Sequence, residues 1–290
     1  MSGDPDKYPT ASGRRRFVKG VVGSAALGSV ATGGATAIGL TTSSSGVGGG
    51  ITEYIGIANV DGPAPRAMPL IPVEIASDGT IKGRWPETST ETVNGQEVTV
   101  AKMDLGGMTY SASWFQYCGV QTYAGIDPDA DQDNVFRAVP GTYDWQSDME
   151  QGEALQLSDF EDYETWSNDI GRGGLGKPAK ASWRSQGDNV QTIPVQVLRT
   201  PELPKMINGD GQYSDLSDGV RQFIDAATTE NVMAWLNKCT HFCCVPGFKA
   251  YGGSERFGAE NEVYCQCHQS VYDPFQPVQK QFTALPLPDE

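Results

Sequence analysis

Residues 239–246 read C-T-H-F-C-C-V-P, and residues 265–273 read C-Q-C-H-Q-S-V-Y-D. The chain has 290 residues with only six Cys and two His, and both His and five of the Cys lie between Cys239 and His268. Cys sulfur and His nitrogen are the donors that bind zinc and iron–sulfur groups in proteins. The concentration of these scarce residues in one window therefore indicates a metal site there.

The two stretches supply the same two kinds of ligand. The first contains C-x-H and the second contains C-x-x-H, so the candidate ligands are Cys239, His241, Cys265 and His268. Two Cys and two His suit a tetrahedral Zn²⁺ ion. They also suit a [2Fe-2S] cluster in which one iron keeps the thiolates and the other takes the imidazoles. The spacing by itself leaves both possibilities open.

The residues together resemble the Rieske iron–sulfur proteins, in which C-x-H-x-x-C is followed by C-x-C-H-x-S and a downstream Tyr. The resemblance covers residues 239–272 and implies one [2Fe-2S] cluster per chain. It implies three pairs of residues: Cys239 and Cys265 on one iron, His241 and His268 on the other, and Cys244 and Cys267 as a bridging disulfide.

The resemblance also assigns roles to three neighbouring residues. Ser270 and Tyr272 match the hydroxyl donors that tune the cluster potential in quinol-oxidising members, and Phe242 matches a position that faces the quinol. Hydrogen bonds to the cluster sulfurs stabilise the more negative, reduced form. The chain departs from the family at Cys243 and Gln269, which stand where Gly is usual.

Two structural questions remain at this level. Cys118 and Cys243 are left over, and they are either buried free thiols or the ends of a second disulfide. The tail after Tyr272 is short and ends in L-P-L-P-D-E, so the sequence predicts that the final strand of the base sheet is missing.

The N-terminus has the composition of an export signal. Arg14, Arg15 and Arg16 precede F-V-K, and residues 20–40 then carry no charge. A helix of this length spans roughly 31 Å, close to the thickness of a bilayer core. The pattern resembles a twin-arginine signal. We expect it to be retained as a single-pass anchor of the cell membrane, with the N-terminus cytoplasmic and the head outside, although residues 35–37 also have the form of a cleavage site.

The rest of the chain has mainly β character. Residues 51–60, 73–76, 191–198 and 232–236 are short runs rich in branched residues, and Asn94-Gly95 lies between two alternating stretches as in a β-hairpin. Apolar residues at helical spacing predict one helix within 214–227. The expected fold is a Rieske-like antiparallel β head with a small cluster-binding subdomain, preceded by one transmembrane helix.

The predicted organisation follows the chain from an anchor to a mobile head. It comprises a cytoplasmic twin-arginine region at 1–19, a transmembrane anchor at 20–40, a flexible Gly/Ser hinge at 41–50, an enlarged base region at 51–235, the cluster-binding subdomain at 236–275 and a tail at 276–290.

Three other stretches resemble functional motifs and are interpreted as surface. The glycine-rich run at 171–178 has Pro178 where a phosphate-binding loop needs Ser or Thr. The acidic run at 127–133 lacks the turn Gly and the final Glu of a calcium loop. The acids at 159–162 indicate a solvated face.

The leading functional interpretation is a redox subunit of a quinol-oxidising cytochrome bc type complex, an electron carrier and not a self-sufficient enzyme. The resemblance implies that quinol supplies the electron, that His241 or His268 takes the accompanying proton, and that a cytochrome or blue-copper protein is the acceptor. A cytochrome b subunit is the expected membrane partner. The alternative is the small Rieske subunit of an exported arsenite oxidase or nitrate reductase type enzyme. A structural zinc site and a cytosolic oxygenase ferredoxin fit the residues less well.

The charge of the chain constrains its partners. Lys and Arg total 21 against 36 Asp and Glu, and 21 − 36 gives −15. Residues 1–50 hold five of the basic and two of the acidic residues, so the remaining 240 residues carry 16 − 34, or −18. Nucleic acid is excluded because its phosphates need a basic surface. The acidity is typical of a protein from a halophile, and an acidic face for a cationic partner gives the same count.

Overall fold

A computed structural model describes residues 50–93, 95–118, 130–187 and 190–284. The twin-arginine region, the predicted anchor at 20–40 and the hinge up to residue 49 lie outside these residues. Within the described part of the chain, no helix combines the length and apolar character needed to cross a membrane.

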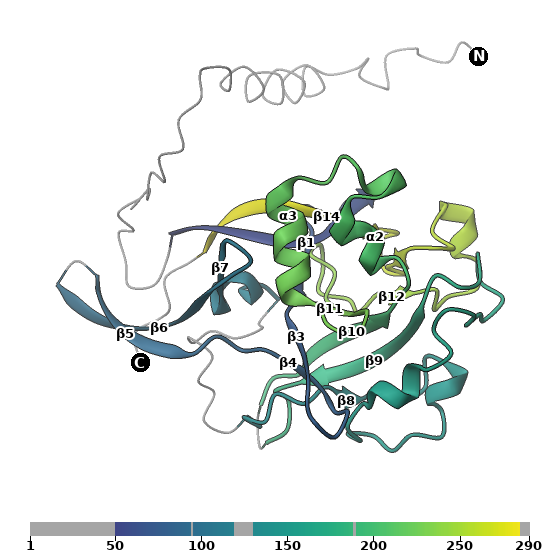
Figure 1. Cartoon of the computed structure of the whole chain (residues 1–290), viewed down its shortest axis with the longest axis horizontal. Helices are drawn as coiled ribbons and strands as arrows, with labels where there is room; N and C mark the ends of the chain where they lie inside the picture. The colour runs from purple at the N-terminus through teal and green to yellow at the C-terminus, as the bar shows by residue number, and fades with distance from the viewer. Residues whose placement is uncertain (1–49, 94, 119–129, 188–189, 285–290) are drawn as a thin grey trace, which may run out of the picture. The chain divides into compact units, whose positions relative to one another are not determined.

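The described residues are mainly β, with antiparallel pairing throughout (Figure 1). The strands are β1 (Gly50–Asp61), β2 (Met68–Ile71), β3 (Val73–Ile75), β4 (Ile81–Gly83), β5 (Thr88–Val93), β6 (Gln96–Leu105), β7 (Met108–Ser111), β8 (Arg137–Ala138), β9 (Lys177–Trp183), β10 (Ile193–Arg199), β11 (Val232–Leu236), β12 (Gly247–Phe248), β13 (Val263–Tyr264) and β14 (Val271–Ala284). The helices are α2 (Leu203–Asn208) and α3 (Asp218–Ala227), with short 3₁₀ turns at η1 (Ala112–Phe115), η2 (Asp144–Gln146), η3 (Leu157–Phe160), η4 (Gly211–Tyr213) and η5 (Ser254–Phe257).

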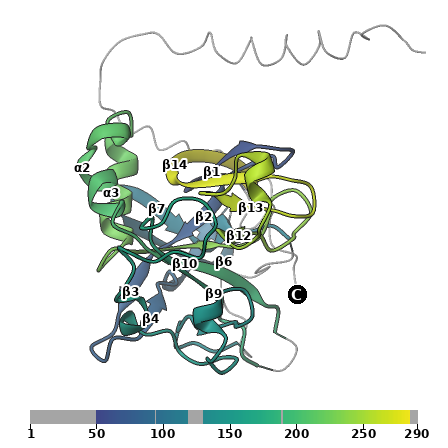
Figure 2. The ribbon, with the colours of Figure 1, turned by 90° about the vertical axis from the view of Figure 1, so that its right-hand side faces the viewer.

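One nine-stranded sheet carries the two metal-ligand stretches. Its strand order is β12-β13-β14-β1-β2-β11-β10-β9-β8. The smaller sheets are the β3-β4 pair and the β5-β6-β7 ribbon, whose β5-β6 end reaches out at the left of Figure 1. In Figure 2, α2 and α3 lie on the opposite side from β12 and β13. Helix α3 still contacts β14, the strand that follows the second stretch.

The prediction that a final base strand is missing is wrong. Strand β14 follows directly after the second stretch and pairs with β1 from Gly50↔Ala284 to Asp61↔Val271. The pairing shifts register between Ile57, which pairs with Pro277, and Ala58, which pairs with Asp273. Pro lacks the N–H that a sheet ladder needs and is tolerated at such irregularities. The prolines therefore make this strand hard to recognise from the sequence, and its partner β1 lies more than 200 residues earlier in the chain.

The local predictions for the other elements are confirmed. Strands β1, β3, β10 and β11 fall on the four predicted runs, although β3 ends at Ile75 and β10 begins only at Ile193, and the predicted hairpin is β5-β6. Helix α3 begins after Ser217, whose side chain accepts a hydrogen bond from the Val220 N–H as an N-cap. Its Phe223 packs against Trp114, with ring centroids 5.2 Å apart. These elements bury one aromatic-rich core beneath the sheet.

Candidate metal centre

The fold brings the two stretches together as two loops. The first Cys/His loop (residues 239–244) follows β11 and leads to β12, and the second Cys/His loop (residues 265–270) connects β13 to β14. Strands β12, β13 and β14 are neighbours in the sheet, and β12 and β13 are labelled toward the right of Figure 2. Tyr264 pairs with Val271, so the second loop is the closed end of a hairpin.

Both loops have the same backbone hydrogen bonds. In each, the first Cys, Cys239 or Cys265, donates its N–H to the carbonyl five residues later. Its own carbonyl accepts the N–H of the residue four positions later. The four N···O distances lie between 2.7 and 3.0 Å. Because the turns match, each loop presents its first Cys in an equivalent position.

The two departures from the family pattern occupy equivalent positions in these turns. Cys243 has φ 62° and Gln269 has φ 61°, both in the left-handed region. Glycine adopts this conformation without strain, whereas a side chain disfavours it. The turn geometry thus explains why Gly suits these positions, and this chain keeps the geometry with larger residues.

The two predicted thiol ligands are buried and close to each other. Cys239 and Cys265 are each 1% exposed, and neither forms a disulfide. A hydrogen bond from Cys265 lowers the pKa of Cys239 to about 5, against the opposing effect of burial. The pKa of Cys265 is raised well above its usual value, because its thiol donates this hydrogen bond to Cys239 and is buried. The two shifts have opposite directions, so Cys239 is the more acidic thiol of the pair.

The two imidazoles lie side by side. The ring centroids of His241 and His268 are 4.8 Å apart, with the ring planes at 84°. The Nδ1 atom of His241 is buried and has no hydrogen-bond partner among the described residues. A buried, unpaired imidazole nitrogen beside a second imidazole is the arrangement that a metal ion satisfies.

Phe242 packs against both imidazoles from the outside. Its ring centroid lies 4.4 Å from that of His241 and 4.9 Å from that of His268, and the side chain is 64% exposed. Val245 is also exposed close by in the chain. The surface next to the two histidines is therefore apolar.

The two predicted hydroxyl donors lie beside Cys239. Tyr272 is buried and donates its hydroxyl to the Cys239 Sγ at 3.3 Å. Ser270 is fully buried, and its Oγ forms no hydrogen bond within the described residues, although its proximity contributes to the lowered pKa of Cys239. Both hydroxyls are thus positioned around a sulfur that a metal would share.

Thr240 and Gly62 support the loops and were not found by sequence reasoning. The N–H of Thr240 donates to the Tyr272 Oη at 3.0 Å, and its Oγ1 donates to the Arg66 carbonyl at 2.7 Å. Gly62 has φ +82°, and a Cβ there would lie 2.5 Å from the Gln269 carbonyl oxygen. Both contacts join segments far apart in the chain, so no local sequence pattern predicts them.

Two disulfides brace the loops. Cys244 is bonded to Cys267, the pairing that the resemblance implies, and this bond joins the two Cys/His loops. Cys118 is bonded to Cys243, which resolves the open question in favour of a second disulfide. Adjacent cysteines in the first loop are therefore tied to two different parts of the chain.

Removing the Cys118–Cys243 disulfide should destabilise the protein more than removing the Cys244–Cys267 disulfide. The Cys118–Cys243 bond spans 125 residues, whereas the Cys244–Cys267 bond spans 23. On the chain-entropy model, the paired serine variants should lose about 5 and about 3.5 kcal/mol respectively. Urea unfolding of each double variant measures this order, and an unchanged midpoint without the 118–243 bond would contradict it.

One close group of three potential ligand atoms occurs among the described residues. The sulfurs of Cys244, Cys265 and Cys267 all lie within 4.8 Å of one another. Two of these sulfurs form a disulfide and are not free thiolates. Of the predicted ligands Cys239, His241, Cys265 and His268, only Cys265 belongs to this group.

The motifs interpreted as surface lie outside this site. The loop at 171–176 precedes β9, and Gly171 packs against the Glu260 carbonyl. In the described part of the acidic run, Asp131 and Asp133 pair with Arg137. Asp162 pairs with Lys177. These charges therefore have local structural roles.

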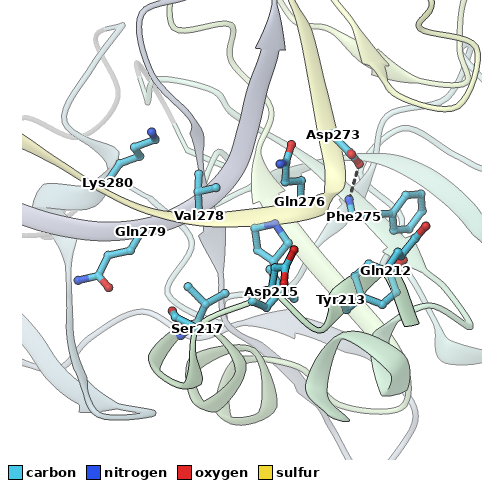
Figure 3. A pocket seen from close by; sticks show the side chains of 13 residues that line it. Gln212, Tyr213, Asp215, Ser217, Asp273, Phe275, Gln276, Val278, Gln279 and Lys280 are labelled. Atoms are coloured by element: carbon cyan, nitrogen blue, oxygen red, sulfur yellow. Dashed lines mark hydrogen bonds between the residues drawn. The ribbon is translucent and has the colours of Figure 1, made fainter. Parts of the chain in front are cut away.

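A groove of about 620 Å³ lies between β14 and the segment from η4 to the start of α3 (Figure 3). Asp273 and Tyr213 line it, and the Asp273 Oδ1 accepts the Phe275 N–H at 2.8 Å. Burial raises the pKa of Asp273. None of the predicted ligands lines this groove, so it is separate from the candidate metal centre.

Comparison with known proteins does not identify a family for this chain. No protein-family model matches the chain, and searches of curated proteins and of solved structures find no match either.

Proposed function

We propose that this chain is a Rieske-type electron carrier that binds one [2Fe-2S] cluster between its two Cys/His loops. The observation that carries the proposal is the meeting of two buried thiols and two adjacent imidazoles on matching loops. The ligands would be Cys239, Cys265, His241 and His268. When bound, such a cluster accepts and releases one electron.

The pairing of the four candidate ligands by type favours a cluster over a single zinc ion. The Cys239 and Cys265 thiols interact with each other, and the ring centroids of His241 and His268 are 4.8 Å apart. Two paired sets of ligands, with the sulfurs together and the imidazoles together, suit two metal atoms with different ligands.

The imidazoles would couple electron transfer to proton transfer. The buried Nδ1 of His241 would face the metal, which leaves its Nε2 to hold or release a proton at the surface. The His268 side chain is exposed on the same surface. These groups would take the proton that quinol loses on oxidation, so no separate base is required.

The surroundings of the histidines suit an apolar redox partner. Phe242 and Val245 are exposed there and would contact a quinol and the membrane subunit that holds it. We therefore place the chain in a cytochrome bc type complex, as the partner of a cytochrome b subunit and the electron donor to a cytochrome or blue-copper protein. Both disulfides fit an exported head in an oxidising compartment.

An EPR-monitored redox titration of the full-length chain tests the proposal. We expect a rhombic signal of reduced [2Fe-2S] and a midpoint in the upper part of the roughly −150 to +300 mV Rieske range. The midpoint should fall at alkaline pH, because the reduced form holds the imidazole proton more tightly.

Two other outcomes would overturn parts of this proposal. A midpoint that does not change with pH and lies at the low end of the range would exclude the quinol-oxidising role. Bound zinc without an EPR signal would exclude the cluster itself.

A further inference from the structure

Lys180 is buried next to the segment that follows the first Cys/His loop. It lies in β9 and is 6% exposed, and its ammonium group donates a hydrogen bond to the Pro246 carbonyl. Asn237 donates to the same carbonyl at 3.0 Å. The chain segment that leaves the first loop is therefore fixed to the main sheet by a lysine and an amide.

The position of Lys180 is rigidly determined. Its N–H donates to the Gln146 Oε1 at 2.8 Å, and its carbonyl accepts the Gln146 Nε2 at 3.1 Å. On the other side, a Cβ placed on Gly247 would lie 3.4 Å from the ammonium nitrogen. The ammonium group thus lies in a close-fitting place between β9 and β12, the strands near the two ends of the nine-stranded sheet.

Lys180 has no carboxylate partner in the described part of the chain. No Asp or Glu oxygen there lies within 4.0 Å of its ammonium nitrogen. Lys177 on the same strand contrasts with it, because Lys177 forms an ion pair of 2.8 Å with Asp162. The two lysines are three residues apart, so they point to opposite faces of β9.

Lys180 lies close to the strand that leads to Cys265, because Gly247, whose Cβ position is 3.4 Å from the ammonium nitrogen, pairs with Tyr264. Burial lowers the pKa of Lys180 to about 7, and the Cys265 sulfur acts in the opposite direction. A buried cation without a carboxylate is costly in a protein interior unless some other negative group compensates it. The thiolates required for metal binding would provide that negative charge.

We propose that Lys180 is a positioning residue whose buried positive charge raises the reduction potential of the group held by Cys239 and Cys265. This inference rests on the proposed function. One added electron makes the group and its ligands more negative by one charge, and a nearby fixed cation stabilises that form more than the oxidised form. Lys180 would supply no ligand atom and would act through its charge alone.

The test compares Lys180→Met with Lys177→Met in the full-length, cluster-loaded protein. Redox titration by EPR is done at pH 6, below the pKa of Lys180. At an effective dielectric constant of about 20, unit charges on the order of 10 Å apart change an equilibrium roughly tenfold. We expect a shift of about 59 mV to lower potential for Lys180→Met, the one-electron equivalent of tenfold. Lys177→Met should leave the midpoint unchanged.

Additional variants keep the result interpretable. Lys180→Arg retains the charge and should keep the wild-type midpoint, whereas Lys180→Gln retains a donor to Pro246 and should shift like methionine. Tyr272→Phe is a positive control, because it removes a hydrogen bond to the Cys239 sulfur. An unchanged midpoint in the neutral Lys180 variants would overturn this inference and leave the proposed function intact. Absence of any [2Fe-2S] signal in the wild-type chain would overturn the proposed function as well.

Discussion

The variants Cys265→Ser and His268→Gln will lose the [2Fe-2S] EPR signal completely, with iron per chain falling to the background of the assay. Serine and glutamine occupy similar volumes but do not supply the thiolate and imidazole that hold iron. Cys265 is buried at the closed end of a hairpin, and no other free thiol of the described residues except Cys239 lies beside it. Iron and acid-labile sulfide analysis of the purified variants measures the loss directly.

A neighbouring substitution provides the matched control for the ligand variants. Phe242→Leu changes a side chain in ring contact with both histidines that supplies no ligand atom. It should keep the full iron and sulfide content and the EPR signal. If the Cys265→Ser or His268→Gln protein retained two irons and two sulfides per chain, the ligand assignment would be wrong.

Gly62→Ala should destabilise the protein by about 2–5 kcal/mol, because the new methyl group has no space. At φ +82° any side chain is strained, and the Cβ would also lie 2.5 Å from the Gln269 carbonyl oxygen and 2.6 Å from the Ser270 Cα. Both contacts are backbone atoms of the second Cys/His loop. The loop must move, so iron content should fall together with the urea midpoint.

Gly95→Ala separates the two causes of that effect. Gly95 has φ +83°, almost the same as Gly62, but no atom lies within 4 Å of its Cβ position. This variant should lose no more than about 1–2 kcal/mol and should keep its iron. Equal urea midpoints for the two variants would show that the second loop does not press against Gly62.

The structure also explains how this chain differs from the Rieske pattern that it resembles. The connection between the two loops contains β12, η5 and β13, and Phe257 of η5 stacks on Tyr264 at 5.2 Å. The long region before the first loop supplies Cys118, which binds the first loop covalently, and Lys180, which lies next to the segment that follows it. The region before the first loop is therefore connected to the surroundings of the candidate site at two points, Cys118 and Lys180.

The sequence alone was sufficient for features that depend on residue type or short-range spacing. The clustering of Cys and His identified the four candidate ligands, since few side chains bind soft metals. Alternating and branched runs located β1, β10 and β11, and the apolar spacing after Ser217 located α3. Each Cys/His stretch, strand run and helix run is about ten residues long, which is the range over which backbone propensity and periodicity act.

Tertiary structure decided the features that join distant segments. The β1-β14 pairing, the Cys118–Cys243 bond and the contact of Gly62 with the second loop all connect residues more than 100 positions apart. Sequence pattern carries no information about which of several strands or thiols will meet, because pairing depends on the packing of the whole core. The chain's composition thus determined what kind of centre it could build, and the long-range packing of the sheet decided which charges, glycines and disulfides surround that centre.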